Sequence, residues 1–356
     1  MPAMQEDLGW SFGQASWMNT ANSLGYILGT VTGFLLLARV TARQLFRLGL
    51  VLCAASIPLM ALDIGFAWFI AVRLLSGFGA AWAFSTGGTL VGELYDGDAR
   101  GRGAATGLFF GCAGIGMVVT AAITPALFEA RGVGAWPTAW LGLGAACSVI
   151  LAWPLMEARE RAARADGGSG EAPRRSGRLW SPMLAYFMFA LAHTGYVFFV
   201  FAWTRAQSLP WFYSAGMWAV LGLGVLVSPL LWKGALARWS PPRTLATCCL
   251  CIGVGGALPL LHLQLGIVYI SALLVGSSLF IGPSAMAVLA RQLFAPSDRA
   301  AGLMVFSIVF AIGQTIGSWG FGHVADLFSL TVVLAASSAG LIFASILAAN
   351  SMERCL

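Results

Sequence analysis

Arg73 is the residue best placed to do chemistry inside a membrane. It is the one basic residue that lies well inside a long apolar run of this sequence, because the others within such runs lie at their ends. A charge inside the bilayer costs about 2.5–3.5 kcal/mol on insertion scales and usually marks a functional site. Two interpretations are open. The guanidinium faces a central cavity and binds or steers an anionic group, or it reaches back to the outer interface. We favour the cavity.

Neutral polar side chains recur at helical spacing in other apolar runs. Three of them share one face of the first run, two share a face of the sixth, and one lies near the middle of the tenth. Such residues either line a central cavity or hydrogen-bond a neighbouring helix, which is worth about 0.6 kcal/mol on average in membranes. The candidate cavity residues, besides Arg73, are Asn19, Asn22, Tyr26, His193, Tyr196 and Gln314.

Groups that could couple a reaction to protons are scarce. No carboxylate lies in the middle of an apolar run, because Asp63, Glu93 and Asp326 all fall near run ends. His193 is the mid-run group that titrates near neutral pH, so it is a candidate proton relay. The alternative is that it only packs.

Catalytic and cofactor signatures are missing from the sequence. It contains no HExxH-like cluster, no paired mid-run carboxylates and no GxxxxGK[ST] loop. Cys248 and Cys251 share a helix face, but no His or carboxylate lies nearby to complete a metal site. We therefore predict that the protein is not an enzyme and holds neither a cofactor nor a metal.

Composition defines the class of fold that must position these residues. Of 356 residues, 59% are hydrophobic and 10% are charged, and the mean hydropathy is +0.83. Soluble domains carry roughly 25% charged residues. A β-barrel needs short alternating strands rather than long apolar runs. The sequence therefore predicts an all-α polytopic membrane protein. The net charge of +6 is read as loop charge rather than as a nucleic-acid surface.

Eleven apolar runs are long enough to cross a bilayer, which takes about 20 residues. Their connections carry seventeen of the twenty Lys and Arg residues on one side, against Arg131 and Arg205 on the other. The positive-inside rule places the C-terminus in the cytoplasm and the N-terminus outside. The expected spans are 12–38, 45–62, 67–92, 102–126, 136–156, 179–204, 211–235, 244–262, 265–290, 301–324 and 328–349.

The longest polar stretch divides the chain unevenly. Residues 157–178 read as a flexible cytoplasmic linker between an N-terminal half, 1–156, and a C-terminal half, 179–356. Five spans precede the linker and six follow it, whereas a transporter built from two repeats has equal halves. A charged turn and a small-residue helix follow both the third and the ninth span. We therefore expect the first helix of the N-terminal half to be missing.

Two segments resemble motifs of the major facilitator superfamily. Arg73-Leu-Leu-Ser-Gly77-Phe-Gly79-Ala-Ala is similar to its fourth-helix motif. The segment from Gly103 through Gly107, Gly111, Gly114 and Gly116 is similar to its glycine-rich fifth helix. The resemblance implies a two-half helix bundle and a transport function. It also implies packing or gating roles for Gly77, Gly79, Gly107, Gly111, Gly114, Gly116, Arg39 and Arg43.

Within the superfamily the chain resembles the YbfB/YjiJ type over nearly its whole length. The resemblance rests on Asn22-Ser-Leu-Gly25-Tyr26-Ile-Leu-Gly29, on Gly195-Tyr196 and on Gly313-Gln314-Thr-Ile-Gly317. The opening Met-Pro-Ala-Met is similar to the Pro-x-Met that ends the family's first helix. The resemblance implies that the spans correspond to helices 2–12 of twelve.

Two departures from the family pattern matter for function. Leu37 stands where the loop between helices 2 and 3 usually has an Asp, so only basic residues such as Arg39 and Arg43 remain of that motif. An ion pair that uses this Asp is therefore in doubt. His193 stands where a small or aromatic residue is expected.

These observations predict a secondary transporter of the cytoplasmic (inner) membrane. It would move a small organic solute by alternating access, with a proton or another ion as the coupling partner and the lipid bilayer as its surroundings. The alternative is a non-transporting sensor or interaction protein, or an inactive truncated transporter. Flux of solute into vesicles separates the two readings.

Overall fold

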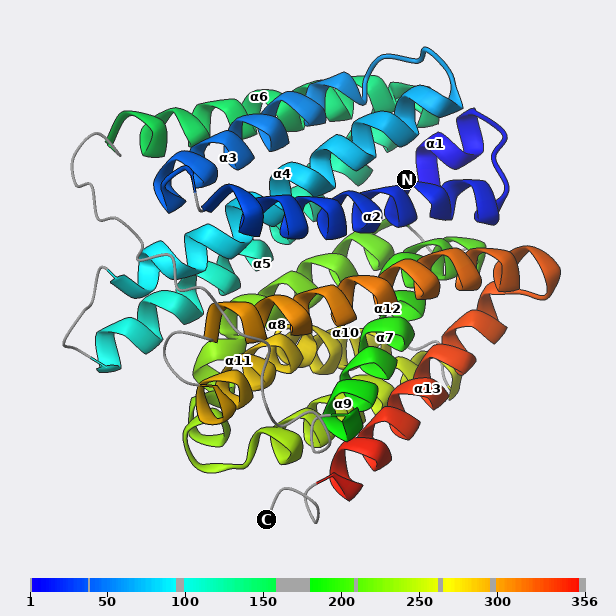
Figure 1. The fold of residues 1–356 in the computed structure, drawn as a ribbon. Helices are drawn as coiled ribbons and strands as arrows, with labels where there is room; N and C mark the ends of the chain where they lie inside the picture. Colours follow the sequence, from blue (N-terminus) through cyan, green and yellow to red (C-terminus); the bar gives the residue numbers. More distant parts are fainter. Residues whose placement is uncertain are drawn as a thin grey trace. The chain divides into compact units, whose positions relative to one another are not determined.

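The structure is a computed structural model that describes residues 2–37, 39–93, 99–157, 180–207, 211–261, 265–294 and 299–351. All regular elements within these residues are helices, as the composition predicts (Figure 1). Eleven of the described helical segments are long and apolar enough to cross a membrane. This number confirms the eleven predicted spans, and the protein is a multi-pass membrane protein.

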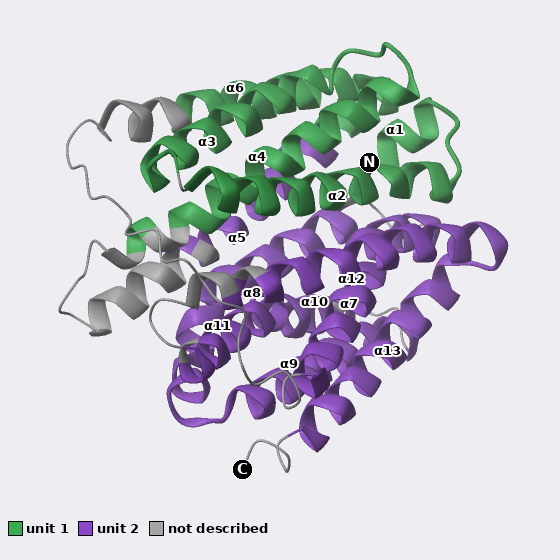
Figure 2. Cartoon of the chain, in the orientation of Figure 1, with its two compact units in different colours: residues 1–106, 127–168 green, residues 107–126, 169–356 purple. Residues whose placement is uncertain are grey.

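The chain forms two compact units (Figure 2). Unit 1 comprises residues 1–106 and 127–168, and unit 2 comprises residues 107–126 and 169–356. The predicted linker lies outside the described residues except for Glu157, so the division into halves at 157–178 stays a prediction. Unit 1 contains α1 (Pro2–Asp7), α2 (Phe12–Leu37), α3 (Ala42–Leu59), α4 (Phe66–Glu93), η1 (Val133–Ala135) and α6 (Trp136–Glu157).

Helix α5 (Ala99–Arg131) contributes to both units, because its middle, residues 107–126, groups with unit 2. The other helices of unit 2 are α7 (Trp180–Ala206), α8 (Trp211–Arg238), α9 (Pro241–Leu261), α10 (Leu265–Leu279), α11 (Ile281–Leu293), α12 (Arg299–Leu327) and α13 (Leu330–Asn350).

Within unit 1, α2 and α3 both pack along α4. Glycines bring the backbones together. A Cβ atom on Gly29 would stand 2.5 Å from the Phe78 carbonyl oxygen, and one on Gly49 would stand 2.6 Å from that of Gly79. Small residues allow this close approach in membranes, where lipid is as apolar as leucine and backbone contact holds helices together.

Within unit 2, α7 is the most buried helix, and α12 and α13 pack along it. Hydrogen bonds between helices supplement the close packing. Ser337 Oγ on α13 donates to the Ala192 carbonyl oxygen on α7 at 2.7 Å, and Ser345 Oγ donates to that of Ala246 on α9 at 2.8 Å. Buried hydroxyls that find a partner in this way avoid the cost of an unsatisfied polar group in an apolar core.

The ninth predicted span is not one continuous helix. It is interrupted at Phe280, between α10 and α11. Pro283 has no N–H group, so it cannot donate a hydrogen bond to the carbonyl of residue 279, and its ring crowds that carbonyl. The next N–H, that of Ser284, donates to the Phe280 carbonyl oxygen at 3.3 Å. Pro283 thus falls in the first turn of α11, where proline is tolerated.

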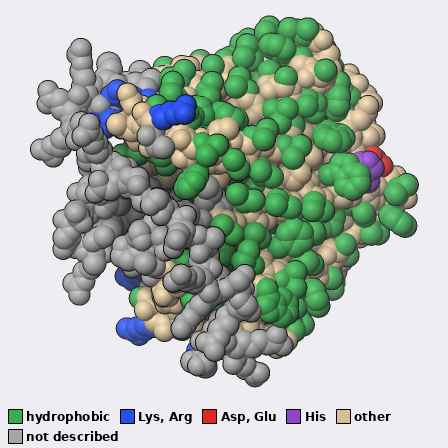
Figure 3. Space-filling view, in the orientation of Figure 1, with side chains coloured by type: hydrophobic (Ala, Val, Ile, Leu, Met, Phe, Trp, Pro, Cys, Tyr) green, Lys and Arg blue, Asp and Glu red, His purple; other side chains and the backbone are tan. Residues whose placement is uncertain are grey.

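Apolar side chains cover much of the described surface (Figure 3). Leu28, Leu35, Leu141 and Val149 are 56%, 63%, 53% and 75% exposed, respectively. Such faces would be unfavourable in water but suit contact with lipid. The surface therefore agrees with the membrane location.

Candidate functional site

Arg73 lies on α4 and contacts α2. Its side chain is half-buried, and its Nε–H donates to the Met18 carbonyl oxygen at 3.1 Å. A guanidinium carries five N–H donors, so the two terminal nitrogens keep four of them. Across the described residues these nitrogens have no hydrogen bond and no ion pair. The structure therefore places a cation inside a spanning helix, held by one neutral carbonyl.

Asn22 on α2 completes the link to α4. Its Nδ2 donates to the Arg73 carbonyl oxygen at 3.3 Å. The side chain and the backbone of Arg73 are thus both tied to α2. Sequence reasoning placed Asn22 in a cavity-lining stripe, but the structure uses its amide N–H to orient the helix that carries Arg73.

The other two residues of the predicted stripe differ from each other. Asn19 is half-buried, and its side chain makes no hydrogen bond within the part of the chain that is described. Tyr26 is half-buried, and its hydroxyl pairs with the Ser85 side chain on α4. Asn19 thus offers an amide next to Met18, whose carbonyl binds Arg73, whereas Tyr26 forms a hydrogen bond that joins α2 to α4.

Glycines of α4 allow close contact with α2 and α3 and so fix the position of Arg73 along α2. A Cβ on Gly77 would collide with the Asn22 carbonyl oxygen, and it would stand 3.0 Å from the Tyr26 backbone nitrogen. A Cβ on Gly79 would stand 2.7 Å from Leu52 Cβ on α3. Gly77 and Gly79 therefore face different neighbours of α4. Close packing on both sides leaves little freedom for the turn that carries Arg73.

His193 lies in an aromatic cluster of α7 and α12. It is 4% exposed, and Nδ1 lies 3.0 Å from the Phe189 carbonyl oxygen. Its ring stacks on those of Phe189 and Phe310, with centroids 5.2 and 5.4 Å away. The family position expects a small or aromatic residue, and the imidazole fills this place as a flat ring among other rings.

Tyr196 and Gln314 occupy different environments in unit 2. Tyr196 is 1% exposed, and its hydroxyl lies 2.8 Å from Ser271 Oγ on α10. Gln314 is half-buried on α12, between two glycines that approach α7. A Cβ on Gly313 would stand 2.7 Å from the Phe187 carbonyl oxygen. The structure thus gives Tyr196 an interhelical hydrogen bond.

The predicted packing glycines of α5 are not equivalent. A Cβ on Gly114 would collide with the Gly222 carbonyl oxygen of α8, and one on Gly111 would stand 3.3 Å from that of Leu226. Gly116 has nothing described within 4 Å of the same position. The surroundings of Gly107 lie outside the described residues.

The predicted gating arginines lie near the start of α3. Arg39 is exposed and Arg43 is half-buried. The described part of the chain gives neither side chain an ion pair. Thr41, between them, caps α3: its hydroxyl accepts from the Gln44 backbone N–H at 3.2 Å, and Gln44 Oε1 accepts from the Thr41 N–H at 2.9 Å.

Sequence reasoning missed Met18, whose carbonyl binds Arg73. Nothing in residue type marks a backbone carbonyl as a partner, because every residue has one. The spacing offers one signal in retrospect. Met18 lies four residues, about one helical turn, before Asn22, so both share the face that meets α4.

Comparison with known proteins agrees with this architecture. The profile of a family described as "Uncharacterised MFS-type transporter YbfB" matches residues 1–349. No curated protein matches the chain.

Proposed function

For this chain, which belongs to the family of the MFS-type transporter YbfB, we propose that it is a secondary active transporter of a small organic anion. Alternating access moves the solute across the cytoplasmic membrane, and Arg73 binds its negatively charged group. One observation carries the proposal: a cationic side chain lies inside a spanning helix and has only a neutral carbonyl as its described partner.

Charge balance supports an anionic solute. A buried charge without a counter-charge is costly, so Arg73 gains most from an anion that enters its surroundings. The chain has 14 Asp and Glu residues, and none of them falls in the middle of a span. Within the described residues no carboxylate pairs with Arg73, and in this proposal the solute supplies the negative charge. A carboxylate suits the terminal edge of the guanidinium because two parallel N–H···O bonds form there.

Neutral amide groups near Arg73 would complete the binding site. Asn19 follows Met18 in the chain and offers one amide. Asn22 holds the Arg73 backbone. In this proposal Asn19 contacts the solute and Asn22 keeps the turn in place. His193 and Gln314, in unit 2, remain candidate cavity residues, and a coupling ion remains a prediction.

The charge distribution supports one orientation. With most basic residues on one side, the C-terminus lies in the cytoplasm and the α1 end of unit 1 lies outside. In this orientation Arg73 lies nearer the outer end of α4.

A panel of organic monocarboxylates provides the test. The purified protein is first screened for a rise in melting temperature, and the carboxylate with the largest effect is then used for flux into proteoliposomes. Arg73→Gln should raise its KM about 10- to 100-fold, because a charge-assisted hydrogen bond is worth about 1.5–3 kcal/mol. Arg131→Gln, at the exposed end of α5, is the matched control and should leave KM unchanged.

The same experiment addresses the sensor alternative. That alternative is favoured by two features of the loop after α2: Leu37 replaces the family's Asp, and exposed Arg39 has no ion pair within the described residues. A carboxylate that stabilises the protein in an Arg73-dependent manner but shows no flux would identify a non-transporting binder. Flux that is unaffected by Arg73→Gln would overturn the role of Arg73.

A further inference from the structure

Three basic side chains surround the turn between α8 and α9 in unit 2. Lys233 and Arg238 lie near the end of α8, and Arg243 lies in the first turn of α9. All three are exposed, and none forms an ion pair with a described residue. We call these residues, together with Trp239 between them, the basic turn.

The surrounding sequence has no carboxylate to balance these charges. No Asp or Glu occurs between Glu171 and Asp298, a stretch that includes all of α7 to α11. Protein surfaces usually carry charges of both signs interspersed. The basic turn therefore keeps its positive charge within this part of the chain and is complementary to an anion.

Trp239 supports the Arg243 side chain. The Arg243 Cζ atom lies 4.8 Å from the centroid of the Trp239 ring, which is a cation–π contact. The tryptophan is half-buried, so the guanidinium stacks on a ring that is partly held by the protein. Stacking uses the face of the guanidinium and leaves its in-plane N–H groups for a phosphate or carboxylate.

The start of α9 lacks the cap that closes α3. The third residue of α3, Gln44, forms a capping box with Thr41. Ser240 precedes α9, and the third residue of α9 is Arg243, which cannot accept a hydrogen bond. Both residues before Arg243 are prolines, so Arg243 supplies the first N–H of the helix, and no described residue accepts it. A cation is unfavourable at this end of a helix dipole, so the turn gains from a nearby anion.

An apolar surface adjoins the charges on α8. Leu230 and Leu231 are 69% and 63% exposed, and both lie within one helical turn of Lys233. Nothing lies within 4 Å of the position where a Cβ on Gly234 would stand, so the surface is open beside Lys233. Exposed leucines next to a cationic helix end suit an amphiphile with an anionic headgroup and apolar chains.

We propose that the basic turn binds an anionic phospholipid with two phosphates, a cardiolipin, in the cytoplasmic leaflet. In the orientation proposed above the α8–α9 turn faces the cytoplasm, where the leaflet carries anionic lipids. Arg243 binds one phosphate through its guanidinium edge and the first N–H of α9, and Lys233 and Arg238 face the other. The acyl chains lie along the exposed leucines of α8. This inference does not depend on Arg73 or on transport.

A lipid titration of the full chain provides the test. The protein is delipidated in a neutral detergent, and its melting temperature is followed as lipid is added. A ligand that binds the folded state raises the melting temperature, and the concentration dependence gives an apparent Kd. Cardiolipin should bind at least tenfold more tightly than phosphatidylglycerol at equal total charge, and phosphatidylcholine should have no effect. Equal Kd values for the two anionic lipids would show that the turn responds to surface charge alone and would overturn the site.

The variant Arg243→Gln separates lipid binding from folding. Glutamine at this position completes a capping box with Ser240, so the lipid-free variant should melt at the parent temperature or above it. Its apparent Kd for cardiolipin should rise about fivefold, since one basic residue at an anionic membrane surface contributes about that factor. Replacing Lys233, Arg238 and Arg243 together by glutamine should raise the Kd about 100-fold. A lower lipid-free melting temperature with an unchanged Kd would make Arg243 a purely structural residue and contradict the proposal.

The corresponding turn of unit 1 supplies the matched control. Arg39 is exposed and lies 199 residues before Arg238, but Val40 stands in the place of Trp239 and α3 already has its cap. Arg39→Gln should therefore leave the Kd for cardiolipin unchanged. If it weakens binding as much as Arg243→Gln does, the lipid recognises basic charge in general and the basic turn is not a site.

Inorganic pyrophosphate distinguishes a lipid from a soluble anion. It carries two phosphates but no acyl chains, so it should not raise the melting temperature at concentrations where cardiolipin does. Equal stabilisation by pyrophosphate would identify a soluble-anion site and overturn the lipid assignment. None of these outcomes bears on the carboxylate site at Arg73, which the flux experiment tests separately.

Discussion

The α2–α4 pair of unit 1 and the α8–α10 pair of unit 2 share a backbone contact but not its chemistry. A Cβ on Gly77 would collide with the Asn22 carbonyl oxygen, and one on Gly276 would collide with that of Leu221. Both the glycines and their partners are 199 residues apart. By the same offset Arg73 corresponds to residue 272, an alanine that is 0% exposed. Both helix pairs have the same close backbone contact, but only the α2–α4 pair has a cation beside it.

The two helix pairs also differ in whether the helix that carries the glycine is continuous. Helix α4 continues through Phe84, whereas its counterpart breaks at Phe280. The offset of 199 residues places Pro283 opposite Phe84. Close helix contact needs only small residues at the crossing and is therefore found in both units. A cation inside a span or a helix break depends on one residue, so the two pairs can differ in these features.

The largest effect is expected where the two pairs are alike. Gly77→Leu and Gly276→Leu should each cost about 3 kcal/mol of unfolding free energy or more, because the new side chain meets backbone that cannot move aside. Denaturant unfolding in detergent measures the loss. Gly116→Leu and Gly142→Leu, where nothing lies within 4 Å, are the controls. A loss at only one of the two crossings would break the comparison.

A comparable effect is expected where the pairs differ in continuity. Phe84→Pro should cost about 3 kcal/mol, since proline inside a helix removes a hydrogen bond and displaces the preceding turn. Phe84 is 37% exposed, so its ring lies partly outside the packed interior. Pro283→Phe should change stability by no more than about 1 kcal/mol, because the first turn of α11 does not need that N–H. Equal losses in the two variants would contradict this account of the break.

The smallest effect is expected at His193, a buried titratable group of α7. It stacks between Phe189 and Phe310, so His193→Phe should retain the packing and lower stability by no more than about 1 kcal/mol. The pH profile of carboxylate flux in proteoliposomes should stay as in the parent protein. A flattened profile would instead make His193 a proton relay, and unit 2 would then hold functional chemistry of its own.

Sequence reasoning was most successful where a single physical cause dominates. Long apolar runs have one stable form in lipid, the helix, because every backbone group must be satisfied within the segment. All eleven spans were therefore predictable. The interruption at Phe280 was not, since proline inside a span can be accommodated by a kink or by a break. The assignment of residues 107–126 to unit 2 was also unpredictable, because hydropathy carries no information about which neighbour a helix chooses.

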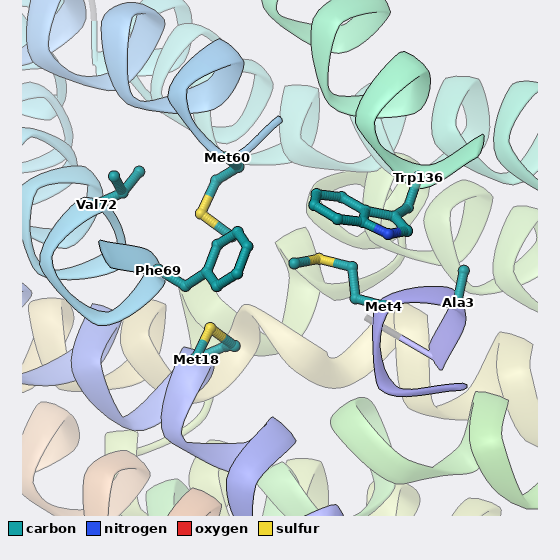
Figure 4. Close-up of a cluster of buried hydrophobic side chains, with 7 residues drawn as sticks. All are labelled: Ala3, Met4, Met18, Met60, Phe69, Val72 and Trp136. Atoms are coloured by element: carbon teal, nitrogen blue, oxygen red, sulfur yellow. The ribbon is translucent and has the colours of Figure 1, made fainter. Parts of the chain in front are cut away.

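The amino-acid sequence by itself determined the class of fold, the membrane location, the family and the presence of a lone cation in a span. The family follows from the resemblance of its motifs, and the others follow from composition and hydropathy. Only the tertiary structure decided that Met18 holds Arg73, that Asn22 orients its helix, that Tyr196 bonds Ser271, and that Met4 of α1 packs in one cluster with Met18 (Figure 4). The reason is physical. Each of these contacts joins helices that are distant in the chain, and backbone approach at a few glycines, rather than residue type, determines which atoms meet.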